Sequence, residues 1–213
     1  MDRSPSPIAA FALIAGACLT GGAAAQTAKL DIPAGRYELD KNHASLTFRV
    51  MHNGLSNYTA RFTRFDATID LDPVRLENSK VSATVDPTSV ETDYPGEADF
   101  DREIATKPEF LDAGKHPAAK FISRSVRASQ DGTLDVLGDL TLRGATHPVT
   151  LNVKINGAKP HPFKKVPVLG ISARGRLQRS QWGVTGFLPD IVADSVGIEI
   201  EAEFIREGQP PAT

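Results

Sequence analysis

The residues best suited to binding a metal are five histidines, because imidazole is the commonest metal-binding side chain in proteins. They are His43, His52, His116, His147 and His161. None belongs to a pair spaced as His-x-x-x-His, and none has a cysteine companion. His43 and His52 could approach each other across a hairpin, but hydrogen bonding at turns or strand ends is the simpler role. The sequence therefore predicts no metal site.

Four arginines offer a planar fork of donors that could meet a phosphate or a quinone oxygen. They are Arg143, Arg174, Arg176 and Arg179. For each of them a solvated strand face is the alternative. Arg179 is the strongest candidate, because Trp182 follows it closely at a strand end. Arg179 could equally hold a corner of the fold in place.

The sequence lacks the patterns that support catalysis. There is no Gly-x-Ser-x-Gly, which would place a nucleophilic serine on a sharp turn, and there is no glycine-rich phosphate loop. Asp99 and Asp101 lie two residues apart, and acidic residues at this spacing suit the start of a helix. We therefore expect a protein that is not an enzyme.

Composition does not point to either of two classes of partner. The formal net charge is -2 and the isoelectric point is about 6.2, whereas nucleic acids and anionic membrane surfaces attract clustered lysine and arginine. Hydrophobic residues make up 40% and charged residues 23%, which is typical of a globular chain.

Residues 1–25 differ from the rest and are predicted to be a secretory signal peptide. Arg3 precedes an apolar run over 8–19, and small residues before Gln26 give an Ala-x-Ala cleavage site. An uncleaved N-terminal anchor is the alternative. Cys18, the only cysteine, lies in this segment, so the predicted domain over 26–213 has no disulfide. The expected location is the periplasm.

Apolar and polar residues alternate with a period of two along most of the remaining chain, as in strands that bury one face. In the segment 61–71 the apolar parity changes between Phe62 and Phe65, which predicts a bulge near Thr63 and Arg64. The expected strands cover 44–50, 61–71, 80–87, 118–128, 134–142, 149–155, 168–178 and 196–204.

Turn signals separate these strands. They are Asn53-Gly54, Asp72-Pro73, Asp131-Gly132, Arg143-Gly144 and Asn156-Gly157. The segment 93–111 instead predicts one short helix, Ala98 to Thr106, and the segments 158–167 and 181–194 are expected to be loops or single turns.

About eight two-faced strands joined by hairpins predict an all-β antiparallel fold. Such a sheet avoids exposed edges by closing into a barrel or by stacking as a sandwich. A barrel of this size is filled by side chains or holds one small ligand. Alternation alone leaves both choices open.

Five blocks then occur in order along nearly all of residues 26–213. They cover 40–54, 62–65, 107–121, 138–151 and 176–183. These blocks resemble the YceI-like, polyisoprenoid-binding family, and 138–151 is similar to its hallmark hairpin. The resemblance implies an eight-stranded antiparallel lipocalin-like barrel with one short helix and an elongated apolar cavity. The chain departs from the family pattern at Ala60, Gln181 and Val184, which concerns the choice of ligand headgroup.

The inward-facing residues of such a barrel are the expected ligand-binding site, although ordinary core packing is the alternative for each of them. Small residues such as Ala67 and Ala83 would keep the lumen open. The predicted site comprises Leu46, Phe48, Val50, Phe65, Ala67, Ile69, Val81, Ala83, Val85, Val136, Leu140, Leu142, Val153, Arg179, Trp182, Ile198, Ile200 and Phe204.

The predicted function is a periplasmic carrier that holds a long isoprenoid lipid, either a polyprenyl lipid or a ubiquinone tail. That lipid is the only bound group expected, with no other cofactor. Two alternatives are kept: an enzyme acting on a hydrophobic substrate in the same cavity, and a filled barrel that serves as an interaction module. A membrane cytochrome and a second copy of the chain are further partners that this interpretation allows.

Overall fold

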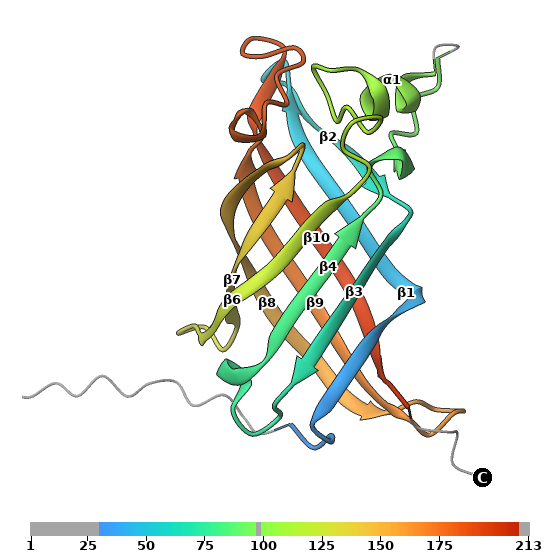
Figure 1. Cartoon of the computed structure of the whole chain (residues 1–213), viewed down its shortest axis with the longest axis vertical. Helices are drawn as coiled ribbons and strands as arrows, with labels where there is room; N and C mark the ends of the chain where they lie inside the picture. The colour runs from blue at the N-terminus through green and yellow to red at the C-terminus, as the bar shows by residue number, and fades with distance from the viewer. Residues whose placement is uncertain (1–29, 97–98, 209–213) are drawn as a thin grey trace, which may run out of the picture.

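The computed structural model describes residues 30–96 and 99–208, and over these residues one antiparallel sheet closes on itself (Figure 1). Hydrogen bonding between β10 and β1 completes the barrel. The strands are β1 (Gly35–His52), β2 (Ser56–Phe62), β3 (Phe65–Leu71), β4 (Lys80–Val85), β5 (Val90–Glu91), β6 (Ala119–Ala128), β7 (Leu134–Leu142), β8 (Ala145–Pro160), β9 (Pro167–Gln178) and β10 (Val192–Arg206).

Ten strand segments make an eight-stranded barrel because two of the strands are interrupted. β2 and β3 both pair with β1, one after the other, and only Thr63 and Arg64 separate them. β4 pairs with β3 and β5 pairs with β2, so they too continue one another. The expected eight-stranded antiparallel barrel is confirmed. The parity change after Phe62 marks the interruption.

Two of the predicted hairpin turns have the left-handed backbone that joins twisted strands without splaying them. At the β1–β2 turn Asn53 and Gly54 have φ of 49° and 66°, and at the β7–β8 turn Arg143 and Gly144 have φ of 50° and 76°. Asparagine tolerates this region and glycine adopts it freely. These turns confirm the prediction.

The predicted turn at Asn156-Gly157 is wrong. β8 continues through both residues to Pro160, and the pairing with β9 only shifts register between Ile155 and Gly157. A bulge adds one residue and increases the local twist, so the same residue types serve inside a long strand. The loop predicted over 158–167 is therefore confined to 161–166.

The helix α1 (Phe100–Thr106) is shorter than the predicted span, whose first residue, 98, lies outside the described residues. Asp99 caps it, because its side chain accepts a hydrogen bond from the Arg102 amide at 3.0 Å. Three short 3-10 helices were not expected: η1 (Leu76–Asn78), η2 (Pro87–Ser89) and η3 (Arg179–Trp182).

The predicted signal peptide, including Arg3, Cys18 and the cleavage site, falls outside the described residues. Among the residues that the structure does describe, no helix is long and apolar enough to cross a membrane.

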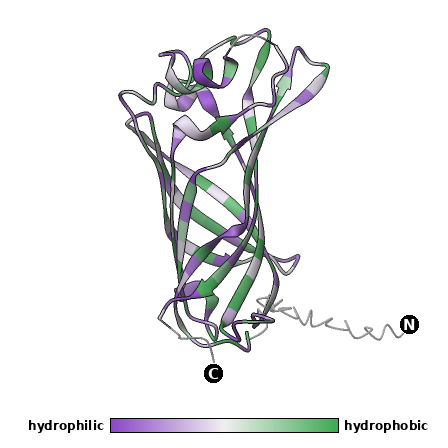
Figure 2. Cartoon of the chain, turned by 90° about the vertical axis from the view of Figure 1, so that its right-hand side faces the viewer, coloured by the Kyte–Doolittle hydropathy of each residue, from purple (hydrophilic) through white to green (hydrophobic). Residues whose placement is uncertain are grey.

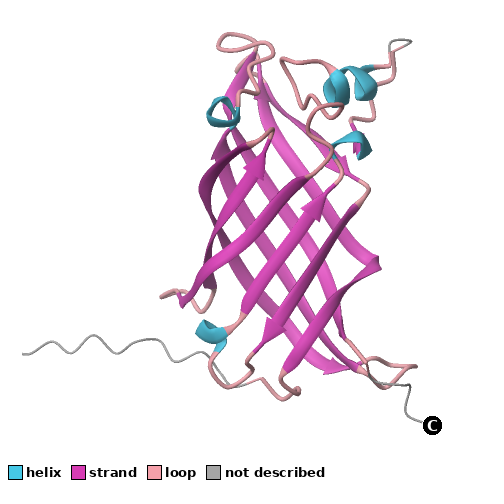
Figure 3. Ribbon diagram, in the orientation of Figure 1, coloured by secondary structure: helices cyan, strands magenta, loops and turns pink. Residues whose placement is uncertain are grey.

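The two ends of the barrel differ (Figure 3). α1, η2 and η3 gather at the end that also holds the β1–β2 hairpin and the 183–191 loop, which we call the open end. At the other end, which we call the closed end, Tyr37, Leu39, Leu71, Leu76 and Phe204 are all buried. Tyr37 is completely inaccessible, and its hydroxyl donates to the Pro33 carbonyl at 2.7 Å.

Candidate lipid-binding cavity

An apolar cavity of about 740 Å³ occupies the lumen of the barrel. This volume falls within the range of roughly 300–1,000 Å³ that is usual for ligand pockets. On β10 its wall extends from Val192 to Phe204. At about 3.3 Å per residue and a tilt of about 40°, that stretch corresponds to a depth of roughly 30 Å.

The lumen is hollow because its large apolar side chains do not fill it. Phe48, Val50, Val153 and Ile198 point inward and line the cavity, yet each remains only half-buried. In a well-packed core such side chains would contact neighbours on all sides. The alternative of a barrel filled by its own side chains is therefore not supported. Figure 2 shows apolar and polar residues alternating along the strands that form this wall.

Small residues keep the middle of the lumen open. Ala67 on β3 pairs directly with Ala83 on β4, and both line the cavity. Gly175 on β9 lies where a Cβ atom would come within 2.7 Å of Leu151 Cδ2. A larger side chain at any of these three positions would enter the cavity or displace a neighbour.

The structure places every predicted site residue except Trp182 on the cavity wall. The periodicity of two identifies these positions because strand side chains alternate between lumen and solvent. Ligand binding by these residues stays a prediction.

Trp182 lies elsewhere, so the prediction that it faces the ligand is wrong. It is buried at the end of η3, its Nε1 donates to the Leu140 carbonyl at 3.1 Å, and its ring meets His147 edge-on. This arrangement closes the barrel wall beside β7 and β8. Trp182 therefore packs in the barrel wall, and its position after a strand end does not distinguish this role from ligand contact.

Arg179 reaches the cavity wall, but its donors are largely occupied. Its guanidinium donates to the carbonyls of Ala193 (3.0 Å), Val184 (3.2 Å), Gly186 (2.8 Å) and Val192 (2.9 Å). Burial lowers the pKa of Arg179, and Asp194 opposes this effect. Four of the five N–H groups of a guanidinium are thus used by the backbone. This geometry favours the alternative role, in which Arg179 holds a corner of the barrel.

Sequence comparison gives the chain a family. A model of the YceI-like domain matches residues 37–204, which is nearly the whole barrel. The chain belongs to the YceI-like family. A UPF0312 protein of Pseudomonas putida strain F1 is 32% identical over 176 residues, covering 82% of this chain and 88% of the relative. A UPF0312 protein of Vibrio parahaemolyticus is 38% identical over 146 residues, covering 68% and 75%.

Solved structures agree with the YceI-like fold. The crystal structure of Burkholderia cenocepacia BcnA superposes with a TM-score of 0.66 at 22% identity, covering 78% of this chain and 98% of that one. A structure described as a polyisoprenoid binding domain from Saccharophagus degradans, implicated in plant cell wall breakdown, gives 0.58 at 11% identity, covering 80% and 98%.

The remaining arginines serve the barrel itself. Arg143 donates to the carbonyls of Gly183 and Pro108 and so ties the 183–191 loop to the segment after α1. Arg174 is paired with Glu199 at 2.9 Å, and Arg176 donates to Ser195 at 3.1 Å, both between β9 and β10. The strand-face interpretation fits Arg174 and Arg176, whereas Arg143 lies in the β7–β8 turn.

The open end contributes wall residues that the strand pattern did not predict. Phe100 and Ile104 of α1 face the cavity from positions i and i+4, a spacing that could have identified them. The Tyr58 hydroxyl donates to the Thr92 carbonyl at 2.7 Å, and the Thr92 amide donates to Asp101 at 2.9 Å. Further residues from this end are Tyr94, Phe110, Leu111, Val184, Phe187 and Ile191.

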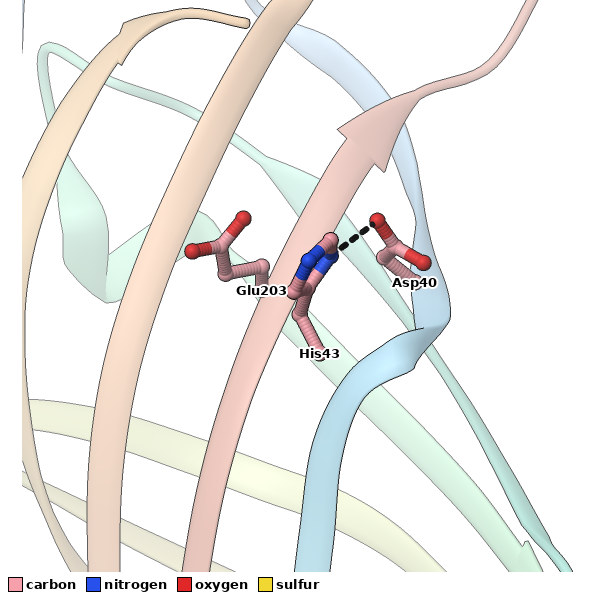
Figure 4. A group of neighbouring side chains, drawn as sticks. All are labelled: Asp40, His43 and Glu203. Carbon is pink, nitrogen blue, oxygen red and sulfur yellow. Dashed lines mark hydrogen bonds and ion pairs between the residues drawn. The ribbon is translucent and has the colours of Figure 1, made fainter.

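His43 and His52 do not meet across a hairpin, because both lie on β1, nine residues apart. His43 instead accompanies Asp40 and Glu203, and their candidate ligand atoms lie within 4.8 Å of one another (Figure 4). His43 Nδ1 is 2.8 Å from Asp40 Oδ2. This bond raises the pKa of the exposed His43. Burial would raise the pKa of Asp40, but hydrogen bonds from His43 and the Asn42 amide outweigh it and lower that pKa.

The His43–Asp40 pair sits where β1 bulges. The pairing of β1 with β10 shifts register between Leu39 and Ala44, and Asp40 also accepts from the Asn42 amide at 3.0 Å. A mostly buried carboxylate with these two donors stabilises the irregular backbone. We interpret the pair as the tie that holds the bulge.

Proposed function

We propose that this YceI-like barrel binds a long isoprenoid lipid in its lumen and carries or stores it without chemical turnover. The observation that carries the proposal is the apolar cavity of about 740 Å³, whose lining includes a single charged side chain among the described residues, Arg179. An isoprenoid tail offers only hydrocarbon to such a wall, and burial contributes about 0.8 kcal/mol per CH₂.

Two further points support this proposal. The relative from Saccharophagus degradans is described as a polyisoprenoid binding domain, although its 11% identity relates it to this chain only by fold. The ionisable groups on the described cavity wall are Arg179, His52, Tyr58 and Tyr94, and no carboxylate lies among them. General acid–base catalysis needs a positioned proton donor or acceptor near the substrate, but the Tyr58 hydroxyl is hydrogen-bonded to the Thr92 carbonyl and the Arg179 guanidinium to four backbone carbonyls, which favours binding over turnover.

The proposal includes a location and partners. We place the carrier in the periplasm on the basis of the sequence of residues 1–25, and fractionation of cells that express the full chain tests this. A membrane cytochrome that exchanges quinone with the carrier, and a homodimer, are extensions of the same proposal. Cross-linking in the cell envelope tests both.

The decisive experiment is mass spectrometry of an organic extract of the protein purified without detergent. We expect one isoprenoid or isoprenoid quinone to co-purify in near-stoichiometric amount. Ile200→Glu places a charge on the cavity wall and is expected to abolish the lipid, because an unpaired charge in an apolar site is strongly unfavourable.

The matched control is Thr84→Glu, at an exposed position on β4 that pairs with Lys120 on β6. It should retain the lipid. Native protein without any isoprenoid, or equal lipid in the Ile200→Glu variant and the wild type, would refute the proposal.

A further inference from the structure

Exposed large apolar side chains concentrate at the open end of the barrel. Four of them lie there: Leu55 at the β1–β2 turn, Tyr94 before α1, and Phe187 and Ile191 in the 183–191 loop. Their exposed fractions are 82%, 50%, 51% and 47%. We call these four residues the rim.

The other exposed large apolar residues of the described chain are scattered. Ile122 lies on β6, while Val74 in the β3–β4 connection and Phe163 in the β8–β9 hairpin lie at the closed end. Isolated apolar side chains on a surface are ordinary, whereas a group around an opening is not.

The rim is held together by the backbone. The Asn53 amide donates to the Ile191 carbonyl at 2.6 Å, so the hairpin that carries Leu55 lies against the loop that carries Phe187 and Ile191 (Figure 1). The Phe187 ring packs on Phe110, with ring centroids 5.7 Å apart. Tyr94 packs on Phe100 of α1 in the same way, at 5.3 Å.

The rim is continuous with the cavity. Tyr94, Phe187 and Ile191 line the cavity and are also exposed to the outside. An apolar chain that leaves the lumen therefore passes over apolar side chains until it reaches the surface of the protein. A route of this kind is useful only when it ends in another apolar environment, because each CH₂ exposed to water costs about 0.8 kcal/mol.

The charges near the rim bear on which apolar environment receives a lipid that leaves the lumen. The segments 53–58 and 183–192 contain no lysine or arginine and a single acidic residue, Asp190. The segment 91–101 around Tyr94 also lacks basic residues and contains five acidic ones. Attraction to anionic lipid headgroups requires clustered basic residues. Contact through this end must depend on insertion of apolar side chains into the interface of a bilayer.

We propose that the open end docks on the surface of a phospholipid bilayer, with Leu55, Phe187 and Ile191 inserted among the headgroups, so that lipid passes between membrane and lumen without crossing water. This inference rests on the proposed function for its cargo but is tested separately. It identifies the bilayer itself as the donor or acceptor surface.

The test is co-flotation of the purified protein with phosphatidylcholine vesicles, which carry no net charge. We expect binding that is unchanged in 0.5 M salt, because at that concentration the Debye length lies between about 10 Å (0.1 M) and about 3 Å (1 M) and attraction between exposed charges is largely screened. The variant Leu55→Ser/Phe187→Ser/Ile191→Ser should bind at least tenfold more weakly. The control Val74→Ser/Phe163→Ser removes exposed apolar residues from the closed end and should bind like the wild type.

A fluorescence measurement checks the orientation. The chain has one tryptophan, Trp182, which is buried, so a second tryptophan at the surface reports separately. Brominated phosphatidylcholine should quench the added emission of Leu55→Trp and leave that of Phe163→Trp unchanged.

Each outcome decides the inference. A wild type that does not float, a closed-end control that loses as much binding as the rim variant, or quenching of Phe163→Trp would overturn it. A rim that instead joins two copies of the chain in solution, seen as a dimer lost in the rim variant, would also overturn it. If the protein floats but carries no isoprenoid, docking stands and the proposed function fails.

Discussion

The closed and open ends of the barrel are built from the same alternation of residues but are filled differently. At the closed end Tyr37, Leu71 and Phe204 are 0%, 6% and 3% exposed. Toward the open end Phe48 and Val50 occupy equivalent inward positions and stay half-buried. The difference shows that the strand itself determines whether a side chain points into the lumen. How deeply that side chain is buried depends on the size of the side chains that the opposite strands place against it.

The largest effect should separate the two ends by stability. Phe204→Ala is expected to lower the free energy of unfolding by about 3–5 kcal/mol, because it creates a cavity in a packed region. Val50→Ala should lower it by about 1 kcal/mol or less, since its side chain already borders empty space. Urea denaturation of the lipid-free proteins measures both. Equal losses at the two positions would contradict the contrast.

Arg179 stabilises the open end, because its guanidinium donates hydrogen bonds to four backbone carbonyls of the 183–191 loop and of β10. Arg179→Lys keeps the charge but not the planar fork, and it should cost about 1–3 kcal/mol because buried carbonyls lose donors. Hydrogen exchange followed by mass spectrometry should accelerate in peptides covering 184–192. The control is Arg174→Lys, which changes an exposed ion pair. If that variant accelerated exchange in the 184–192 peptides to a similar degree, Arg179 would not have the proposed role in holding the loop.

Filling the hollow part should remove capacity without removing stability. Ala83→Leu adds a larger side chain at a half-buried position on the cavity wall, and we expect a stability change of less than about 1 kcal/mol. The amount of co-purified isoprenoid should fall at least twofold. Thr84→Leu points outward from the next position and should keep the full amount. A strongly destabilised Ala83→Leu protein would mean that the lumen has no spare room.

The smallest effect concerns the His43–Asp40 pair at the β1 bulge. The pKa of His43 is raised from 6.5, so the stability that the pair contributes is full below that pH and is lost as the pH rises through the higher value in the folded state. The pKa of Asp40 is lowered from 3.8, so its contribution is lost only as the pH falls through that lower value.

His43→Gln should therefore lower the melting temperature on the order of 1–3 °C at pH 5.5, with a smaller difference at pH 9. Thermal unfolding over this range measures the effect. A difference that is constant with pH would show that His43 acts through packing and not through its charge.

The strands and their inward-facing positions could be predicted because the alternation of apolar and polar residues is visible in each short segment of sequence. The alternation identifies Phe48 and Ile198, and the parity change that predicts a bulge after Phe62 falls where the strand is interrupted. The hollow lumen could not be derived from the same pattern. It depends on pairs that are distant in sequence, such as Gly175 against Leu151 and Ala67 against Ala83, whose combined volume no single segment encodes.

Local cues also failed where one residue type has two uses. Asn156-Gly157 reads as a hairpin turn but forms a bulge inside β8. Trp182 is predicted to contact the ligand, but its ring packs against His147 and its Nε1 donates to the Leu140 carbonyl. In both cases the structure that forms depends on contacts with a neighbouring strand. The residues close in sequence do not indicate which strand that is. The helix residues Phe100 and Ile104, in contrast, had a readable spacing.

The packed side chains at the closed end have a consequence for which molecules the barrel can hold. The cavity ends at Tyr37, Leu76 and Phe204, so we expect a linear lipid of the proposed kind to enter from the open end and to stop at these side chains. Guests shorter than the tube leave space beneath their polar group, and longer ones must fold back or protrude. Under the proposed function we therefore expect the closed end to limit the chain length of the lipid, and trimming Phe204 should shift the preference toward longer chains.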